Sequence, residues 1–326
     1  MLLKGTIDIV VIQNMKKEPS LSIVIPTLNE EESLTELFNL IKKRVTHFQK
    51  ITVIFVDDGS KDATWNVMKS IKTKNRSKKI KVVAIRMMQN HGKALALLAA
   101  FDQIETEFVA TMDADLQDDP AELDKMYQKI EEGFDLVVGW KKKRYDQKSK
   151  LVASRIANGA TKFFTGVNIH DMNCGLKLMR TEVAQSLHIY GDLHRFIPAI
   201  AASKGFKVGE KVVKHKARKY GVSKYGAERL LKSLFDFATI LLITKFSKKP
   251  LHFFGPIGLI NIIIGVLISL HLTILWFMGE TIGTRPLLLL GILLIIFGIQ
   301  TLSIGLLGDL IISQNNDKSY NIKEVK

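Results

Sequence analysis

Two segments near the C-terminal end of the sequence are long and apolar, and they constrain the fold more than any other feature. They run from Leu251 to Met278 and from Pro286 to Ile312, and each holds about 20 consecutive residues with hardly a charge. Such a stretch is long enough to cross a bilayer, and neither segment shows the polar stripe of a helix packed on a soluble core. We therefore predict two transmembrane helices, joined into a hairpin by the short connection 279–285.

Lysines flank this hairpin on both sides: Lys245, Lys248 and Lys249 before it, and Lys318, Lys323 and Lys326 after it. By the positive-inside rule, both flanks lie in the cytoplasm. The sequence therefore predicts a protein of the cytoplasmic membrane in which the large N-terminal part and both termini are cytoplasmic. The single cysteine, Cys174, excludes an internal disulfide and fits a reducing compartment.

The net charge of +15 raises the question of nucleic-acid binding. The cations stand mainly in runs, such as 141–144 and 211–219, without the interleaved aromatic residues that bind nucleic acids. Anionic lipid headgroups attract basic runs of this kind. We therefore expect a membrane surface, and no nucleic acid, as the partner of these cations.

Four short apolar segments, each followed by a helical pattern, organise the first half of the chain. The predicted strands are 21–27, 51–56, 81–86 and 108–112. The helices that follow are expected to begin with Asn29 as cap and Glu32 in a capping box, near Ala63 after the cap Asp62, near Lys93, and at Pro120. Alternating strands and helices imply an α/β fold with a mostly parallel sheet, whose ligands bind at the carboxyl ends of the strands.

Two pairs of aspartates stand at the ends of predicted strands. Asp113 and Asp115 follow the fourth strand; side chains two residues apart lie on one face of an extended backbone, so these carboxylates can hold a divalent cation and, through it, a diphosphate. Asp57 and Asp58 follow the second strand and can accept hydrogen bonds from a base or a ribose. For the second pair, capping of a turn is the alternative explanation.

Two common nucleotide-binding motifs are missing from the sequence. No Gly-x-Gly-x-x-Gly follows the first strand, and His91-Gly92-Lys93 lacks the earlier glycine and the Ser or Thr of a P-loop. These absences exclude a dinucleotide-binding enzyme and a P-loop nucleoside triphosphatase.

The chain resembles family 2 inverting glycosyltransferases in three ordered motifs, at 25–31, 56–60 and 112–118. Further motifs, at 171–178, 194–198 and 218–225, are similar to those of polyprenyl-phosphate glycosyltransferases, namely dolichol-phosphate mannose synthases and bactoprenol glucosyltransferases. The resemblance covers about residues 20 to 250, and several motifs in the same order make chance agreement improbable.

This resemblance implies a GT-A type nucleotide-sugar-binding domain and suggests a role for each matching residue. Those matching the nucleotide-sugar pocket are Pro26, Asn29, Glu30, Asp57, Asp58, Ala114 and Gln117. Asp113, Asp115 and Gln117 match the site of a Mg²⁺ or Mn²⁺ cofactor, and Asp171 matches a catalytic acidic residue near the acceptor phosphate. Polar groups around the donor and acceptor phosphates are matched by Arg195, Arg218, Ser223 and Lys224.

The reaction implied by the resemblance is transfer of a sugar, with inversion, from a nucleotide diphosphate to a polyprenyl phosphate at the cytoplasmic membrane face. A UDP-sugar is favoured because the two-helix anchor matches the bactoprenol branch, and GDP-mannose is the alternative donor. A non-catalytic membrane sensor or scaffold for nucleotide sugars is a second class, which the intact Asp113, Asp115, Asp171 and Arg218 disfavour. A processive polysaccharide synthase would carry a Gln-x-x-Arg-Trp motif, which the sequence lacks.

The expected organisation is a leader at 1–19, a catalytic domain at 20–224, an amphipathic interfacial helix with a linker at 225–250, the transmembrane pair at 251–312 and a tail at 313–326. Apolar residues recur at helical spacing in 152–163 and 229–242, which predicts helices at the membrane interface; ordinary packing on the core is the alternative. Glycines in the transmembrane pair allow close helix packing and hence a homo-oligomer: Gly255, Gly258, Gly265, Gly298, Gly305 and Gly308.

Overall fold

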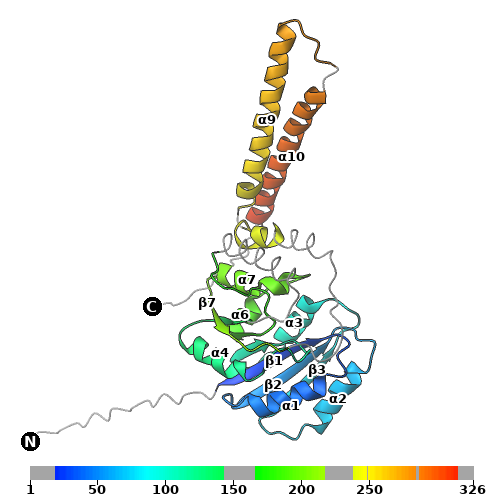
Figure 1. Ribbon diagram of the computed structural model, residues 1–326, viewed down its shortest axis with the longest axis vertical. Helices are drawn as coiled ribbons and strands as arrows, with labels where there is room; N and C mark the ends of the chain where they lie inside the picture. Colours follow the sequence, from blue (N-terminus) through cyan, green and yellow to red (C-terminus); the bar gives the residue numbers. More distant parts are fainter. Residues whose placement is uncertain (1–18, 143–165, 217–237, 248, 284–285, 315–326) are drawn as a thin grey trace, which may run out of the picture.

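The structure is a computed structural model that describes residues 19–142, 166–216, 238–247, 249–283 and 286–314. An α/β domain carries a long two-helix hairpin at one end (Figure 1). The predicted interfacial helix at 152–163, the first 18 residues and the segment 315–326 lie outside the described residues.

A mixed sheet forms the centre of the domain. Its described strands are β1 (Ser20–Thr27), β2 (Lys50–Asp57), β3 (Ile80–Arg86), β4 (Phe108–Thr111), β5 (Leu136–Trp140), β6 (Lys177–Arg180) and β7 (Val208–Val212), in the order β3-β2-β1-β4-β6-β5-β7. Strand β6 runs antiparallel to β4 and β5, and the other pairs are parallel. The prediction of a mostly parallel sheet agrees with this arrangement, and the four predicted strands agree with β1 to β4 within a residue or two.

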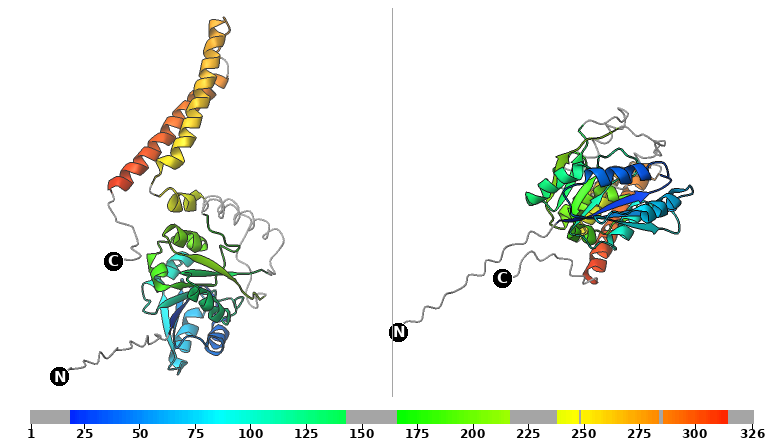
Figure 2. Two further views of the ribbon diagram at one scale, coloured as in Figure 1. Left: turned by 90° about the vertical axis from the view of Figure 1, so that its left-hand side faces the viewer. Right: turned by 90° about the horizontal axis from the view of Figure 1, so that it is seen from below.

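Helices cover both faces of the sheet (Figures 1 and 2). Those of the domain are α1 (Leu34–Arg44), α2 (Thr64–Lys74), α3 (Lys93–Phe101), α4 (Glu122–Glu131), α6 (Thr181–Ser186), the 3₁₀ helix η1 (Leu193–Phe196) and α7 (Ile197–Ser203). Helices α1 and α2 contact each other, whereas α3 packs on β1 and β2 and contacts η1. Their apolar sides bury Leu37, Met68 and Leu97 in one core with the strand residues Ile23 and Phe55.

The start of the first helix differs from the prediction. Helix α1 begins at Leu34 with Ser33 at its N-cap position, so Asn29 is not the cap and Glu32 completes no capping box. Asn29 instead adopts a left-handed backbone conformation, with a φ of 55°, and its side-chain oxygen accepts a hydrogen bond from the backbone N–H of Lys61 at 2.8 Å. The short polar side chain of asparagine tolerates this conformation and shapes the exit from β1. Helix α4 begins at Glu122, two residues after the predicted Pro120.

The two predicted membrane segments form the helices α9 (Leu251–Phe277) and α10 (Pro286–Gln314). Both are long and apolar enough to cross a membrane, and most of their large apolar side chains point outward. The Asp309 carboxylate accepts a hydrogen bond from the backbone N–H of Leu251 at 3.3 Å, which places the start of α9 beside the last turns of α10. The two flanks of the hairpin therefore leave it on the same side.

Glycines form the contact between the two helices. A β-carbon added to Gly258 would lie 2.7 Å from the carbonyl oxygen of Gly298, and one added to Gly265 would lie 2.6 Å from that of Gly291. Glycine allows this approach because it lacks a side chain. Gly258, Gly265 and Gly298 are thus used for packing within one chain, and an oligomer stays a prediction.

Residues 238–244 are helical and lie between the α/β domain and the hairpin (yellow in Figure 2). Ile240 is fully buried and Ile243 packs against the domain core. The described part of the predicted amphipathic helix therefore packs on the protein.

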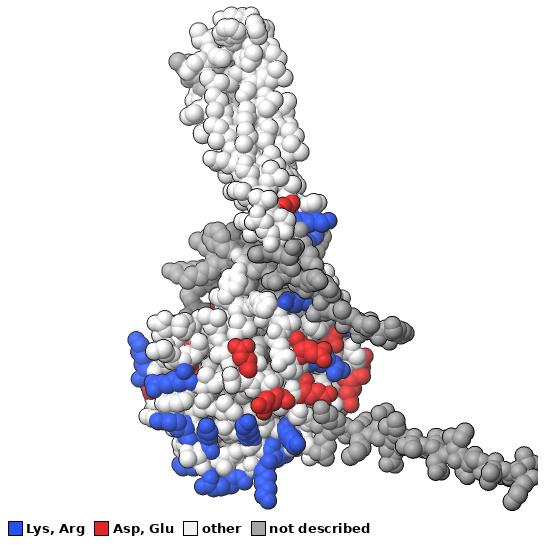
Figure 3. All heavy atoms as spheres, turned by 180° about the vertical axis from the view of Figure 1, so that it is seen from behind, with Lys and Arg blue, Asp and Glu red and all other residues white. Residues whose placement is uncertain are grey.

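Figure 3 shows one face on which Lys and Arg gather over the end of the domain farthest from the hairpin. The basic runs 141–144 and 211–219 are only partly described, so their contact with a membrane stays a prediction.

Candidate functional site

Asp113 lies just past the carboxyl end of β4, at the edge of the sheet where the parallel strands β1 and β2 also end. Its side chain lies against Gly175: a β-carbon added to Gly175 would come within 2.6 Å of the Asp113 carboxyl carbon. The hydroxyl of Thr111 donates a hydrogen bond to the Gly175 carbonyl at 2.7 Å, which fixes the glycine beside the strand. The missing side chain of Gly175 therefore leaves the space that the carboxylate occupies.

Three lysines surround Asp113. Lys93 forms an ion pair with its carboxylate, and Lys141 and Lys177 lie close enough to attract it. Burial raises the pKa of Asp113, but these positive charges outweigh burial and hold that pKa well below its usual value. Asp113 is therefore ionised at neutral pH, and about a third of its side chain (33%) is exposed.

The other two lysines are held by neighbours of their own. Lys141 pairs with the buried carboxylate of Asp118 at 2.7 Å; burial lowers the pKa of Lys141, but this attraction outweighs it and raises that pKa. The Lys177 ammonium donates a hydrogen bond to the carbonyl of Cys174, and burial lowers the pKa of Lys177 to about 8. Among the described residues, Lys93 is thus the lysine in direct contact with Asp113.

The loop after Asp113 holds the second carboxylate in a tight turn. Asp115 is 8% exposed, and its Oδ1 accepts a hydrogen bond from the backbone N–H of Gln117 at 3.2 Å. Leu116, between them, has a φ of 63°, which is rare for a residue other than glycine, asparagine or aspartate. Such a conformation persists only where surrounding contacts impose it, and it often accompanies a functional site.

The same loop is tied to the chain that follows β7. Lys216 donates its backbone N–H to the Gln117 carbonyl at 2.9 Å, and the Gln117 side-chain amide donates to the Lys216 carbonyl at 3.5 Å. Asp118 forms an isolated β-bridge with His215. The predicted phosphate-binding residues Arg218, Ser223 and Lys224 come next in sequence and lie outside the described residues.

The residues predicted to line the nucleotide pocket connect the ends of β1 and β2. Pro26 lies in β1, and beyond it the backbone N–H groups of Asn29 and Glu30 donate to the hydroxyls of Ser60 and Thr64, each at 2.9 Å. Asp57 is fully buried; its Oδ1 accepts the backbone N–H of Ser60 at 2.8 Å. The structure therefore brings this predicted set together.

Asp58 and Ala114 are also buried, so their contacts are mainly with the protein. The two carboxylate oxygens of Asp58 accept hydrogen bonds from the backbone N–H groups of His91 and Gly92, at 2.8 and 2.9 Å. Asp58 therefore holds the loop that leads into α3, a contact that the sequence pattern did not indicate.

The acceptor-side residues lie on the loop before β6 and on η1. Asp171 is 2% exposed, and its carbonyl accepts the backbone N–H of Cys174 at 3.4 Å. Arg195 forms an ion pair with Asp192 at 2.9 Å. His194, beside it, is buried; burial and the charges of Lys93 and Lys177 lower its pKa to about 3.

The carboxylates of Asp113 and Asp115 are suitable ligands for Mg²⁺ or Mn²⁺. These ions prefer oxygen ligands and are commonly held by one or two carboxylates together with substrate phosphates. Asp113 is ionised and part exposed, and Asp115 stands two residues away. No group of three or more His, Cys, Asp and Glu side chains that could hold a metal alone occurs in the described part of the chain. The arrangement thus fits a metal that binds together with a phosphate ligand.

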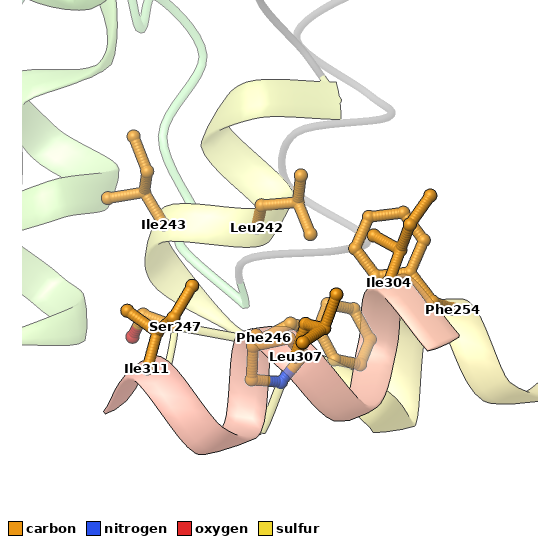
Figure 4. A pocket seen from close by; sticks show the side chains of 10 residues that line it. Leu242, Ile243, Phe246, Ser247, Phe254, Ile304, Leu307 and Ile311 are labelled. Atoms are coloured by element: carbon orange, nitrogen blue, oxygen red, sulfur yellow. The ribbon is translucent and has the colours of Figure 1, made fainter. Parts of the chain in front are cut away.

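An apolar cavity of about 470 Å³ lies away from these carboxylates, at the base of the hairpin. Figure 4 shows Leu242 on the helix at 238–244, and Phe254, Ile304 and Leu307 on the hairpin, around this cavity; Ile243 also lines it and extends towards the α/β domain. Among the lining residues that the structure describes, Ser247 has the one polar side chain. The described lining of the cavity therefore suits an apolar chain.

Comparison with known proteins identifies the class of this protein. The family model "Glycosyl transferase family 2" matches residues 22–187, about half of the chain, so the chain belongs to that family. The fold is similar to that of glucosyl-3-phosphoglycerate synthase from Mycobacterium tuberculosis in complex with Mn²⁺, UDP-glucose and phosphoglyceric acid. The TM-score is 0.53 and the identity 18%, over 69% of this chain and 81% of that chain, which confirms the predicted GT-A fold.

Curated relatives resemble the chain over most of its length. Dodecaprenyl-phosphate galacturonate synthase from Rhizobium johnstonii is 35% identical over 298 residues, which are 89% of this chain and 87% of that protein. Undecaprenyl-phosphate 4-deoxy-4-formamido-L-arabinose transferase from Pseudomonas aeruginosa is 32% identical over 291 residues, which are 88% and 84%. Both are polyprenyl-phosphate glycosyltransferases by name, and the resemblance to that branch is confirmed.

Proposed function

We propose that this chain transfers a sugar from a nucleotide diphosphate donor to a polyprenyl phosphate, with inversion, at the cytoplasmic face of the membrane. One observation carries the proposal: Asp113 and Asp115 stand at the carboxyl edge of a GT-A sheet, in a chain whose C-terminal helices are long and apolar enough to cross a membrane. The curated relatives support the same acceptor class by their names. Residues 20–224 form the catalytic part in this proposal, and 225–250 connect it to the membrane.

The donor binds across the ends of β1, β2 and β4. Pro26, Asn29, Glu30 and Asp57 shape the nucleotide pocket, and Asp113, Asp115 and Gln117 would hold Mg²⁺ or Mn²⁺. Such an ion, when bound, would supply positive charge for the departing nucleotide diphosphate. Lys93, Lys141 and Lys177 add positive charge near Asp113.

The acceptor phosphate is the nucleophile. One of its oxygens forms the new bond to the anomeric carbon, while the bond from that carbon to the donor diphosphate breaks on the opposite side. A phosphate monoester has a second pKa of about 6 and is largely a dianion at neutral pH, so it hardly needs a general base. We therefore assign to Asp171 the task of orienting the acceptor, with Arg195, Arg218, Ser223 and Lys224 around the phosphates.

The acceptor chain reaches the site from the membrane. The cavity between the helix at 238–244 and the hairpin is lined almost entirely by apolar side chains, and it lies where the α/β domain meets the predicted bilayer. We place a part of the isoprenoid chain there. Lys245 and Lys249, just before α9, fit the headgroup level on the cytoplasmic side.

The experiment that tests the proposal is mass spectrometry of lipids after incubation of the purified protein in detergent with undecaprenyl phosphate, Mn²⁺ and one donor at a time. UDP-glucose, UDP-N-acetylglucosamine and GDP-mannose cover the predicted donors, and UDP-linked galacturonate and 4-deoxy-4-formamido-L-arabinose follow from the relatives' names. We expect a glycosylated lipid from a UDP-sugar. Product from GDP-mannose alone would establish the alternative donor, and absence of product from all five would contradict the proposal.

A further inference from the structure

Lys93 forms an ion pair with Asp113, the carboxylate that the proposed function assigns to metal binding. It is the first residue of α3, and its ammonium pairs with Oδ1 of Asp113. The other oxygen, Oδ2, is the atom that lies nearest the position of a β-carbon on Gly175. Oδ1 of Asp113 is therefore paired with Lys93, a movable side chain, while Oδ2 occupies the space beside Gly175.

The backbone that carries Lys93 is held firmly. Asp58 accepts hydrogen bonds from the N–H groups of His91 and Gly92, the two residues before Lys93. Gly59 lies against the same loop, since a β-carbon added to it would be 2.7 Å from the backbone nitrogen of Asn90. The ammonium thus hangs on a flexible four-carbon stem from a fixed point, and it can leave Asp113 without movement of the loop.

A lysine and a divalent cation compete for one carboxylate. Each is a cation, and like charges a few ångströms apart repel strongly where water is partly excluded. Lys93 and Asp113 are each about one third exposed, at 31% and 33%, so their pair can be reached from solvent. The diphosphate that arrives with the metal carries negative charge. The ammonium of Lys93, once released from Asp113, can pair with that charge.

We infer that Lys93 is a displaceable counter-ion: it occupies Asp113 in the empty enzyme, yields to a metal that arrives with the nucleotide diphosphate, and then contacts that diphosphate. This inference rests on the proposed metal site. Its consequence is order in binding, because the metal binds weakly alone and tightly with the nucleotide.

The test is the affinity of the full-length protein in detergent for MnCl₂, followed by electron paramagnetic resonance of free Mn²⁺, with and without UDP. Without UDP, Lys93→Met is expected to bind Mn²⁺ about tenfold more tightly than the wild type, because the competing charge is gone. With UDP, this advantage is expected to disappear. Lys93→Arg keeps the charge and should bind Mn²⁺ alone as weakly as the wild type.

The control is Lys43→Met, an exposed lysine in the last turn of α1, far from the carboxyl edge of the sheet, which should change nothing. Folding is checked by thermal melting, and Lys93→Gln carries the same expectation if Lys93→Met does not fold. Unchanged or weaker Mn²⁺ binding by the neutral variants, with normal binding by the wild type in the presence of UDP, would overturn the inference alone. If the wild type binds no Mn²⁺ even with UDP, the metal site falls and the inference with it.

Discussion

The α/β domain and the hairpin distribute apolar and polar groups in opposite ways. In the domain, large apolar side chains are buried and carboxylates gather at one edge of the sheet. In the hairpin, large apolar side chains point outward and small residues form the contact between the helices. Glycine shows the difference best: Gly175 makes room for the carboxylate of Asp113, whereas Gly298 makes room for the backbone of Gly258. Substitutions in the domain edge should therefore change chemistry, and those in the hairpin should change stability.

The largest effect is expected from Asp115→Asn, which tests whether substitutions at the edge of the sheet reduce turnover rather than stability. Asparagine keeps the size and the turn with Gln117 but loses the charge, so turnover should fall at least about 1,000-fold while the melting temperature hardly changes. The comparison variant is Asp102→Asn, an exposed carboxylate at the end of α3. If Asp115→Asn retained one tenth of the wild-type rate, Asp115 would not be needed for metal binding or catalysis.

Gly175→Ala sharpens the comparison on the domain side. The added β-carbon would come within 2.6 Å of the Asp113 carboxyl carbon and must displace that carboxylate. We expect a loss of turnover of about 100-fold, because a misplacement of about 1 Å at a reacting group has that cost. Steady-state rates and a thermal melt measure it; a variant that unfolds but, where folded, turns over normally would show that this glycine is structural.

Gly298→Val makes the opposite prediction in the hairpin. A β-carbon there would lie 2.6 Å from the Gly258 carbonyl oxygen, so the helices must separate, at a cost of about 1–3 kcal/mol. Unfolding of the protein by SDS titration should show the loss, with the rate per folded molecule kept. Gly255→Val is the matched control, since its nearest neighbour, Leu251, is at an ordinary 3.6 Å. Equal destabilisation by both variants would contradict the glycine contact.

Asp171→Asn tests the claim that the acceptor hardly needs a general base. The amide keeps the shape of the carboxylate, and the acceptor phosphate is already ionised above neutral pH, so the rate should fall only about tenfold. Rates from pH 7 upward, measured beside the affinity for acceptor, decide the matter. A rate below about 1% of the wild type over that whole range, with unchanged binding, would make Asp171 a true base.

The smallest effect is expected at His194. Burial and nearby lysines lower the pKa of His194 to about 3 in the folded protein. At pH 6 this imidazole is therefore largely protonated in the unfolded chain and neutral in the folded protein. This group's contribution to the free energy of unfolding is thus complete above its ordinary pKa of about 6.5 and declines as the pH falls from there towards 3. Between pH 8 and 6, His194→Gln should lose about 1 kcal/mol less stability than the wild type. The exposed His188→Gln is the control, and parallel curves would contradict the assignment.

The sequence predicted the elements whose pattern is local. The first four strands, the mostly parallel sheet and both long apolar helices follow from runs of apolar residues, and these agree with the structure. Strands β5, β6 and β7 were not predicted: β5 is a run of only five residues, β6 has four residues and includes the buried Lys177, and β7 contains the adjacent charged residues Glu210 and Lys211. Asn29 was wrongly expected to cap a helix. Its side-chain oxygen instead accepts a hydrogen bond from the backbone N–H of Lys61, in another loop.

The candidate site was predictable in its carboxylates and not in its cations. Asp113 and Asp115 stand at the end of an obvious strand, whereas Lys93, Lys141 and Lys177 come from three distant parts of the chain and meet only in the fold. A signal for Lys93 was present: it directly follows the loop after a parallel strand and opens a helix, at the edge where ligands bind. Its partner could not be read, because an ion pair across 20 residues depends on tertiary structure.

The most direct test of the central claim, that metal-dependent sugar transfer occurs at the end of β4, is the transfer of radiolabelled sugar to undecaprenyl phosphate by the wild type and by Asp113→Asn, with Mn²⁺ and with EDTA. Label in the lipid fraction is expected from the wild type with Mn²⁺, and from neither the EDTA sample nor the variant. Equal label from the wild type and Asp113→Asn, or label that persists in EDTA, would contradict the account.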